Sequence, residues 1–127
     1  MIVIDNSALV EALIGASPSK ELVTVVAEEQ LHVPQLIDYE FRSALRGLLL
    51  AGKVTPSRAE GARIVKESLP LTRHSDDVTG DRAWDLRGDF NAYDATYVAL
   101  AELLDCPLVT ADAKIAREVR TVRVELH

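Results

Sequence analysis

The sequence predicts an α/β fold, in which helices cover the faces of a β-sheet. Short β-rich apolar runs alternate along the chain with longer segments whose apolar residues recur at helical spacing. The 127 residues are 48% hydrophobic and 27% charged, which is ordinary composition for a globular protein with a buried core. No internal repeat, low-complexity tract or long linker divides the chain, so we expect residues 1–127 to form a single domain.

The first half of the chain predicts two strands and four helices. Asp5 and Pro34 end the two apolar runs, and Gly52 closes the longest helical segment. Ser7 is expected to cap the first helix, and Ser17-Pro18 to start the second, with the proline in its first turn. Strands are therefore expected at residues 2–4 and 31–33, and helices at residues 7–14, 18–30, 35–51 and 56–69, the last two resembling a helical hairpin.

The second half predicts three strands and three helices. The segment from Tyr93 to Leu104 is apolar nearly all round, so we expect this helix to be central. The run at residues 121–124 alternates in polarity, as an edge strand does. Strands are expected at residues 71–73, 107–110 and 121–124, and helices at residues 76–88, 93–104 and 112–118. Four acids that recur every four residues are expected to form a solvated helical stripe: Asp77, Asp81, Asp85 and Asp89.

Composition excludes several classes of protein. The single cysteine, Cys106, allows no intrachain disulfide and no cysteine-based zinc cluster. No apolar run is long enough to span a bilayer and no secretory signal is evident, so a soluble cytoplasmic protein is expected. The net charge of −6 argues against a protein that coats nucleic acid through bulk positive charge. It is compatible with an enzyme that acts on nucleic acid through a metal ion and a local basic patch.

Four acidic residues occupy positions unlike those of ordinary surface acids. Asp5 and Asp112 come just after predicted strands, where ligand sites of open α/β sheets lie. Glu40 falls within the apolar arc of its helix, and Asp94 begins the most apolar helix of the chain. Each has a structural alternative: a turn or helix cap for Asp5 and Asp112, a capping box with Asn91 for Asp94, and a margin position or an arginine partner for Glu40.

Taken together, the four acids predict a metal site. The strands that precede Asp5 and Asp112 are expected to end at the same edge of the sheet, and the helices carrying Glu40 and Asp94 begin near that edge. Four converging carboxylates repel one another, and a hard divalent cation with oxygen ligands relieves that repulsion. Mg²⁺ or Mn²⁺ is the cation expected here.

The ordered set of motifs resembles the PIN-domain ribonucleases, specifically the VapC-type toxins of toxin–antitoxin pairs. The resemblance covers the whole chain and combines several short motifs with Glu40. These motifs are Ile2-Val3-Ile4-Asp5-Asn6-Ser7, Asn91-Ala92-Tyr93-Asp94-Ala95, Tyr97-Val98-Ala99-Leu100-Ala101-Glu102 and Pro107-Leu108-Val109-Thr110-Ala111-Asp112.

The resemblance implies a PIN-like three-layer sandwich of about five mainly parallel strands with helices on both faces. It implies a Mg²⁺-dependent endoribonuclease with an acidic pocket of Asp5, Glu40, Asp94 and Asp112, in which Asp5 and Asp94 are the firmest metal ligands. Ser7, Thr110 and Asn91 fall at supporting positions. No fifth acidic ligand is expected, because Ile115, Ala116 and Arg117 occupy the stretch where some relatives carry one. The resemblance also implies an antitoxin partner and a homodimer.

Basic and apolar surface residues suggest where such partners bind. Lys114 and Arg117, with Arg120 and Arg123 nearby, are candidates for contact with RNA phosphates, or else form a solvated helix and edge strand. Arg42 and Arg46 lie opposite the Glu40 face and are candidates for antitoxin contact. The run at residues 48–50 either contributes to a dimer or partner groove or is buried within the helical hairpin.

Three other functions require different residues. A receiver-type signalling domain also has an acidic Mg²⁺ pocket, but this chain offers no aspartate in the mid-chain stretch Lys53–Pro56 and no paired acids at the first strand. A phosphatase with Asp5 as nucleophile requires a second aspartate where Ser7 stands. A non-catalytic PIN-like interaction scaffold stays open, although all four acids are present.

Overall fold

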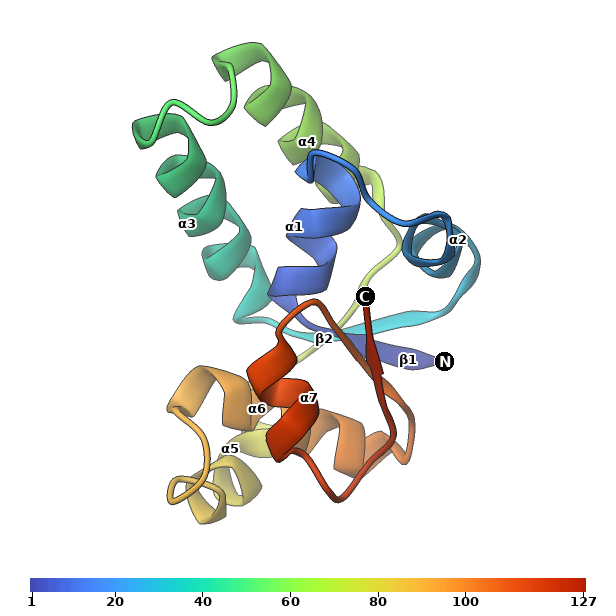
Figure 1. The fold of residues 1–127 in the computed structure, drawn as a ribbon. Helices are drawn as coiled ribbons and strands as arrows, with labels where there is room; N and C mark the ends of the chain where they lie inside the picture. The colour runs from blue at the N-terminus through green and yellow to red at the C-terminus, as the bar shows by residue number, and fades with distance from the viewer.

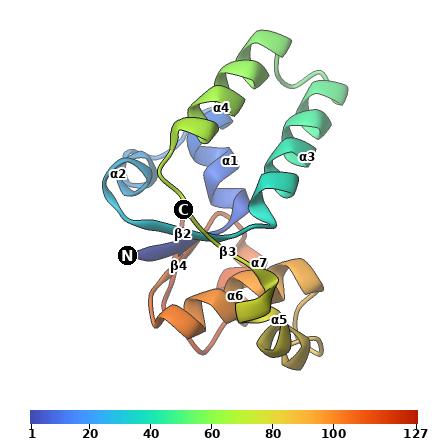
Figure 2. The same ribbon diagram turned by 180° about the vertical axis from the view of Figure 1, so that it is seen from behind.

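The computed structural model describes residues 1–127 and contains five strands and seven helices, in the predicted order (Figures 1 and 2). The strands are β1 (Ile2–Ile4), β2 (Leu31–Pro34), β3 (Thr72–His74), β4 (Leu108–Thr110) and β5 (Val124–Leu126). The helices are α1 (Asn6–Ile14), α2 (Lys20–Glu28), α3 (Ile37–Leu50), α4 (Pro56–Ser68), α5 (Asp76–Asp85), α6 (Ala92–Leu104) and α7 (Ala113–Glu118).

The strands form one sheet in the order β3-β2-β1-β4-β5, and every neighbouring pair is parallel. The chain proceeds outward from β1 through β2 to β3 and then returns to the other side of β1 for β4 and β5. The direction of winding therefore reverses between β1 and β4, which is where open α/β sheets place their ligand sites. Both of these strands are fully buried.

The helices cover the two faces of the sheet in separate groups, which confirms the predicted three-layer arrangement. Figure 1 shows α1, α3 and α4 on one face, and α5 and α6 on the other. The central helix α6 is buried along most of its length and packs beneath β1, β2 and β4. Phe41 of α3 and Leu100 of α6 are among the largest fully buried side chains. None of the seven helices has the length and apolar character needed to cross a membrane.

Several local details differ from the sequence predictions. Asp5, and not Ser7, caps α1, because its carboxylate accepts the backbone N–H of Ala8 at 3.0 Å. The cap of α2 is Ser19, two residues after the start predicted at Ser17, and it accepts from the N–H of Leu22. The last strand occupies residues 124–126 rather than 121–124, because its pairing with the buried strand β4 begins at Leu108 opposite Val124.

The hairpin of α3 and α4 extends away from the sheet (Figure 2). Gly52 ends α3 in the left-handed conformation, at φ 67°, as the sequence predicts. Leu48 packs against the core, whereas Leu49 and Leu50 are 38% and 71% exposed. The hairpin therefore buries only part of this leucine run.

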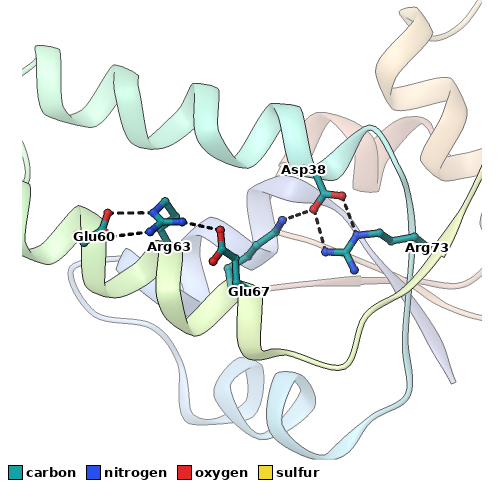
Figure 3. Close-up of polar contacts among 6 residues, drawn as sticks. Asp38, Glu60, Arg63, Glu67 and Arg73 are labelled. Atoms are coloured by element: carbon teal, nitrogen blue, oxygen red, sulfur yellow. Dashed lines mark hydrogen bonds and ion pairs between the residues drawn. The ribbon is translucent and has the colours of Figure 1, made fainter.

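An ion network anchors the hairpin to the edge of the sheet (Figure 3). Lys66 of α4 is 5% exposed, and its ammonium group donates to the Asp38 carboxylate of α3. Arg73 of β3 donates to the same carboxylate through two nitrogens, at 2.7 and 3.0 Å. On the outer side of α4, Arg63 pairs with Glu60 and Glu67, each at 2.6 Å. Asp38 therefore joins α3, α4 and β3.

We expect Asp38→Asn to lower the free energy of unfolding by about 2–4 kcal/mol, because it leaves the buried ammonium of Lys66 without a counter-charge. The pKa of Asp38 is lowered to about 2, above all by the hydrogen bond from Arg73, with Lys66 adding to it. Since the carboxylate is more strongly ionised in the folded state, this stabilisation is complete above about pH 4 and is lost as the pH falls toward about 2. Urea unfolding at pH 7 and across this range measures both effects.

Glu60→Gln is the matched control for Asp38→Asn, because it neutralises an acid in an exposed ion pair of the same hairpin. Its unfolding midpoint is expected to stay close to that of the wild type. The anchoring role of this network would be contradicted if both variants lost the same free energy of unfolding. It would also be contradicted if the stability of Asp38→Asn fell between about pH 4 and about pH 2 as much as that of the wild type.

Candidate active site

The four predicted acids come from four elements that meet at the carboxyl edge of the sheet. Asp5 directly follows β1, and Asp112 follows β4 after a single intervening residue. Glu40 and Asp94 lie in the first turns of α3 and α6. Electrostatic interactions link these carboxylates: the charges of Asp94 and Asp5 act on Glu40, and those of Asp112 and Asp5 act on Asp94. The structure thus brings together all four residues that the sequence singled out.

Asp5 is the most buried of the four acids, with 3% of its surface exposed. One carboxylate oxygen, Oδ1, accepts from the Ser7 hydroxyl at 2.7 Å and from the N–H of Ala8 at 3.0 Å. The other, Oδ2, accepts from the Thr110 hydroxyl at 2.7 Å. Burial raises the pKa of Asp5, and these hydrogen bonds act in the opposite direction. The carboxylate is therefore held in one orientation by donors on both oxygens.

Ser7 and Thr110 also connect the two central strand–helix junctions. The Ser7 hydroxyl accepts from the N–H of Ala111 at 3.0 Å, and the Thr110 hydroxyl accepts from the N–H of Asp112 at 3.0 Å. Each hydroxyl donates its proton to Asp5 and receives one from the loop after β4. Both hydroxyls therefore contact Asp5 directly, and their supporting role in a catalytic site stays a prediction.

Glu40 is half-buried and has no arginine partner, contrary to one of its structural alternatives. Its Oε1 accepts from the Tyr97 hydroxyl at 2.7 Å. Burial raises the pKa of Glu40, the hydrogen bond from Tyr97 opposes this shift, and the charges of Asp94 and Asp5 add to it. The sequence names Tyr97 only as the first residue of one family motif and assigns it no role in the site. Its position three residues after Asp94, on the same helix face, is the signal that could have linked it to the pocket.

Asp94 and Asp112 combine positions in the pocket with helix-capping contacts. The Asn91 side chain accepts from the N–H of Asp94 at 2.8 Å, so Asn91 supports the start of α6 rather than touching a pocket carboxylate. Asp112 caps α7 by accepting from the N–H of Lys114 at 2.8 Å. Burial is the largest cause of the raised pKa of Asp94, and the charges of Asp112 and Asp5 raise it further. The charge of Lys114 lowers this pKa.

The donor set fits a hard divalent cation in its chemistry. All four acids offer carboxylate oxygens, the ligand type that Mg²⁺ and Mn²⁺ prefer. None of the ion pairs in the structure involves any of the four, so their mutual repulsion is not relieved by a lysine or arginine contact. No three acidic, histidine or cysteine side chains are already arranged around a single ion position.

The basic residues predicted to contact RNA lie on and after α7. Lys114 and Arg117 are exposed, one helical turn apart, and the charge of Lys114 reaches Asp94. Arg120 is also exposed. Arg123 instead pairs with Glu125 at 2.9 Å beside the edge strand. The candidate basic patch therefore consists of Lys114, Arg117 and Arg120, without Arg123.

Comparisons with known proteins identify the family of the chain. The family model of the PIN domain matches residues 2–120. Ribonuclease VapC9 of Mycobacterium tuberculosis is 41% identical over 118 residues, covering 91% of this chain and 89% of that relative.

Two solved structures share the fold. FitAcB of Neisseria gonorrhoeae covers 98% of this chain and 96% of its own, at a TM-score of 0.69 and 15% identity. VapBC2 of Rickettsia felis, bound to a DNA fragment from its promoter, covers 98% of both chains at a TM-score of 0.66 and 14% identity. From the family match and the extent of the identity to a VapC ribonuclease, the chain belongs to the PIN-domain family.

Proposed function

We propose that this protein is a divalent metal-dependent endoribonuclease that acts as the toxin of a toxin–antitoxin pair. One observation supports the proposal above all others: four carboxylates from β1, α3, α6 and β4 converge at the reversal point of the sheet without a cationic partner. Relatives named as VapC ribonucleases are 41% and 35% identical over 91% and 90% of the chain, which supports the same function here. The receiver-type alternative is not favoured by these matches.

Asp5 and Asp94 are proposed as the principal ligands of Mg²⁺ or Mn²⁺, with Glu40 and Asp112 as secondary ligands. These residues would hold the ion, which would supply Lewis-acid chemistry for hydrolysis of an RNA phosphodiester. Ser7 and Thr110 hold Asp5 in a fixed orientation through hydrogen bonds of 2.7 Å each. This orientation is set before any ligand arrives, as a preorganised site requires.

Lys114 and Arg117 are proposed to contact the RNA backbone beside the pocket. Both are exposed on the first two turns after Asp112 and form none of the ion pairs in the structure. Their positive charges next to four carboxylates allow an acidic protein to retain a polyanion locally. Asn91 contributes indirectly, by capping the helix that carries Asp94.

An antitoxin protein and a second copy of the chain are proposed as partners, following the family resemblance. Leu49 and Leu50 leave apolar surface exposed at the end of α3, which suits such contacts. Arg42 and Arg46 are exposed on the same helix and stay candidates for antitoxin contact.

We expect Asp5→Asn to lower the rate of RNA cleavage by at least about a hundredfold while the fold is retained. Asparagine keeps an oxygen that can accept from the Ala8 N–H, so the helix cap survives while the negative charge is lost. Cleavage of a labelled RNA panel with Mg²⁺ or Mn²⁺ measures the loss, and circular dichroism checks the fold. Asp81→Asn, on the exposed stripe of α5, is the matched control. Full cleavage by Asp5→Asn would remove Asp5 from the catalytic site, whereas no cleavage by either protein would favour the non-catalytic scaffold.

We expect Asp94→Asn to match or exceed the wild type in thermal stability when metal is absent, because it removes a charge from a cluster of like charges. The raised pKa of Asp94 means that the folded metal-free state binds its proton more tightly. Stability of the metal-free wild type should therefore fall as the pH rises above about 4, and less so in the variant.

Melting temperature with and without Mn²⁺ tests the same variant in the loaded state. Saturating Mn²⁺ is expected to raise the melting temperature of the wild type, by an amount equivalent to about 2.7 kcal/mol at a hundred times the Kd, and to have little effect on Asp94→Asn. An equal shift in both proteins would remove Asp94 from the ligand set.

We expect Lys114→Ala and Arg117→Ala to weaken RNA binding uniformly across sequences. Each loss of a phosphate contact should lower the slope of log K against log salt concentration by about 0.7 for single-stranded RNA. Binding to the inactive Asp5→Asn protein at several salt concentrations measures the slope. Arg46→Ala, on α3, is the control. An unchanged salt slope in both α7 variants would mean that neither Lys114 nor Arg117 contacts RNA phosphates.

A further inference from the structure

Tyr97 forms the hydrogen bond that holds Glu40, and none of the roles described above uses it. Its side chain is 2% exposed, so its hydroxyl group is directed into the interior and not toward solvent. The hydroxyl donates to Glu40 Oε1 at 2.7 Å. Tyr97 belongs to α6 and Glu40 to α3, so the contact joins the two helices that carry Glu40 and Asp94.

Glu40 needs such a restraint because its surroundings disfavour its charge. It is half-buried, and the charges of Asp94 and Asp5 act on it. A glutamate side chain has rotational freedom, and repulsion would drive an unrestrained carboxylate toward solvent. A hydroxyl donor on Oε1 opposes that movement and leaves Oε2 without a hydrogen-bond partner. Asp5 is restrained in a similar way by the hydroxyls of Ser7 and Thr110.

We infer that Tyr97 is a positioning residue of this site: its hydroxyl holds Glu40 so that the second carboxylate oxygen faces the divalent cation. The inference rests on the proposed metal-dependent function and assigns a separate task to a residue that does not itself contact metal or RNA.

The test is the affinity of the RNA-free protein for Mn²⁺, measured by electron paramagnetic resonance of the free ion. Tyr97→Phe keeps the buried ring and removes only the hydroxyl, and is expected to weaken Mn²⁺ binding about three- to tenfold. RNA cleavage by this variant should recover at raised Mn²⁺ concentration, with kcat close to that of the wild type. Tyr93→Phe, an exposed tyrosine on the same helix, is the matched control and should bind Mn²⁺ as the wild type does.

A double-mutant cycle with Glu40→Gln separates positioning from general packing. If Tyr97 acts through Glu40, adding Tyr97→Phe to Glu40→Gln should change Mn²⁺ affinity no further. The inference is overturned if Tyr97→Phe binds Mn²⁺ as the wild type does, if it weakens binding equally in both backgrounds, or if it fails to fold. A wild-type protein that binds no Mn²⁺ would overturn the proposed metal dependence and this inference together. Normal Mn²⁺ binding and cleavage by both wild type and Tyr97→Phe would overturn this inference alone.

Discussion

The buried carboxylate of Asp5 is the constraint on which the centre of this fold depends. A charge with 3% exposure is costly to bury, and the structure supplies three donors to it, from Ser7, Ala8 and Thr110. Because those donors come from the start of α1 and the end of β4, the carboxylate can be satisfied only when the two central strands lie side by side. The hydroxyls of Ser7 and Thr110 accept from the N–H groups of Ala111 and Asp112. These contacts fix the backbone of the loop that carries Asp112.

Acids elsewhere in the fold form ion pairs with lysine or arginine, whereas the four acids of the candidate site do not. Lys66 and Arg73 share Asp38, and Arg82 pairs with Glu102 at 2.6 Å. The four pocket acids have no such partners, and burial and mutual repulsion raise the pKa of Asp5, Glu40 and Asp94. Structural sites normally pair buried charges, so the unpaired acids are the observation on which the proposed metal site rests.

Much of the fold was accessible from the sequence because it is encoded locally. Apolar runs that stop at Asp5 and Pro34, and a helix that ends at Gly52, correspond closely to the observed elements. The placement of Asp5 and Asp112 at one edge of the sheet could also be predicted, because parallel strands end at a common edge. The order of the strands could not be predicted, because no local sequence pattern specifies which strands pair.

Contacts between residues far apart in the chain are the features that could not be predicted from the sequence. Tyr97 meets Glu40 across 57 positions, and Lys66 meets Asp38 across 28, so neither contact has a pattern within one helix. The sequence predicts Ser7 as the cap because serine is a common capping residue, but Asp5 occupies that position and the serine hydroxyl donates to it. In both cases the tertiary environment decides which of several chemically suitable groups is used.

The double use of Asp5, as the cap of α1 and as the deepest acid of the pocket, has a consequence for how this lineage can lose activity. Aspartate and asparagine codons differ by one base, and both residues cap helices well. A single base change at this codon can therefore remove the charge while the cap of α1 is kept. The surfaces of α3 and α7, to which the antitoxin and RNA are proposed to bind, would be unchanged in such a variant. Loss of activity at this position is therefore separable from loss of the fold.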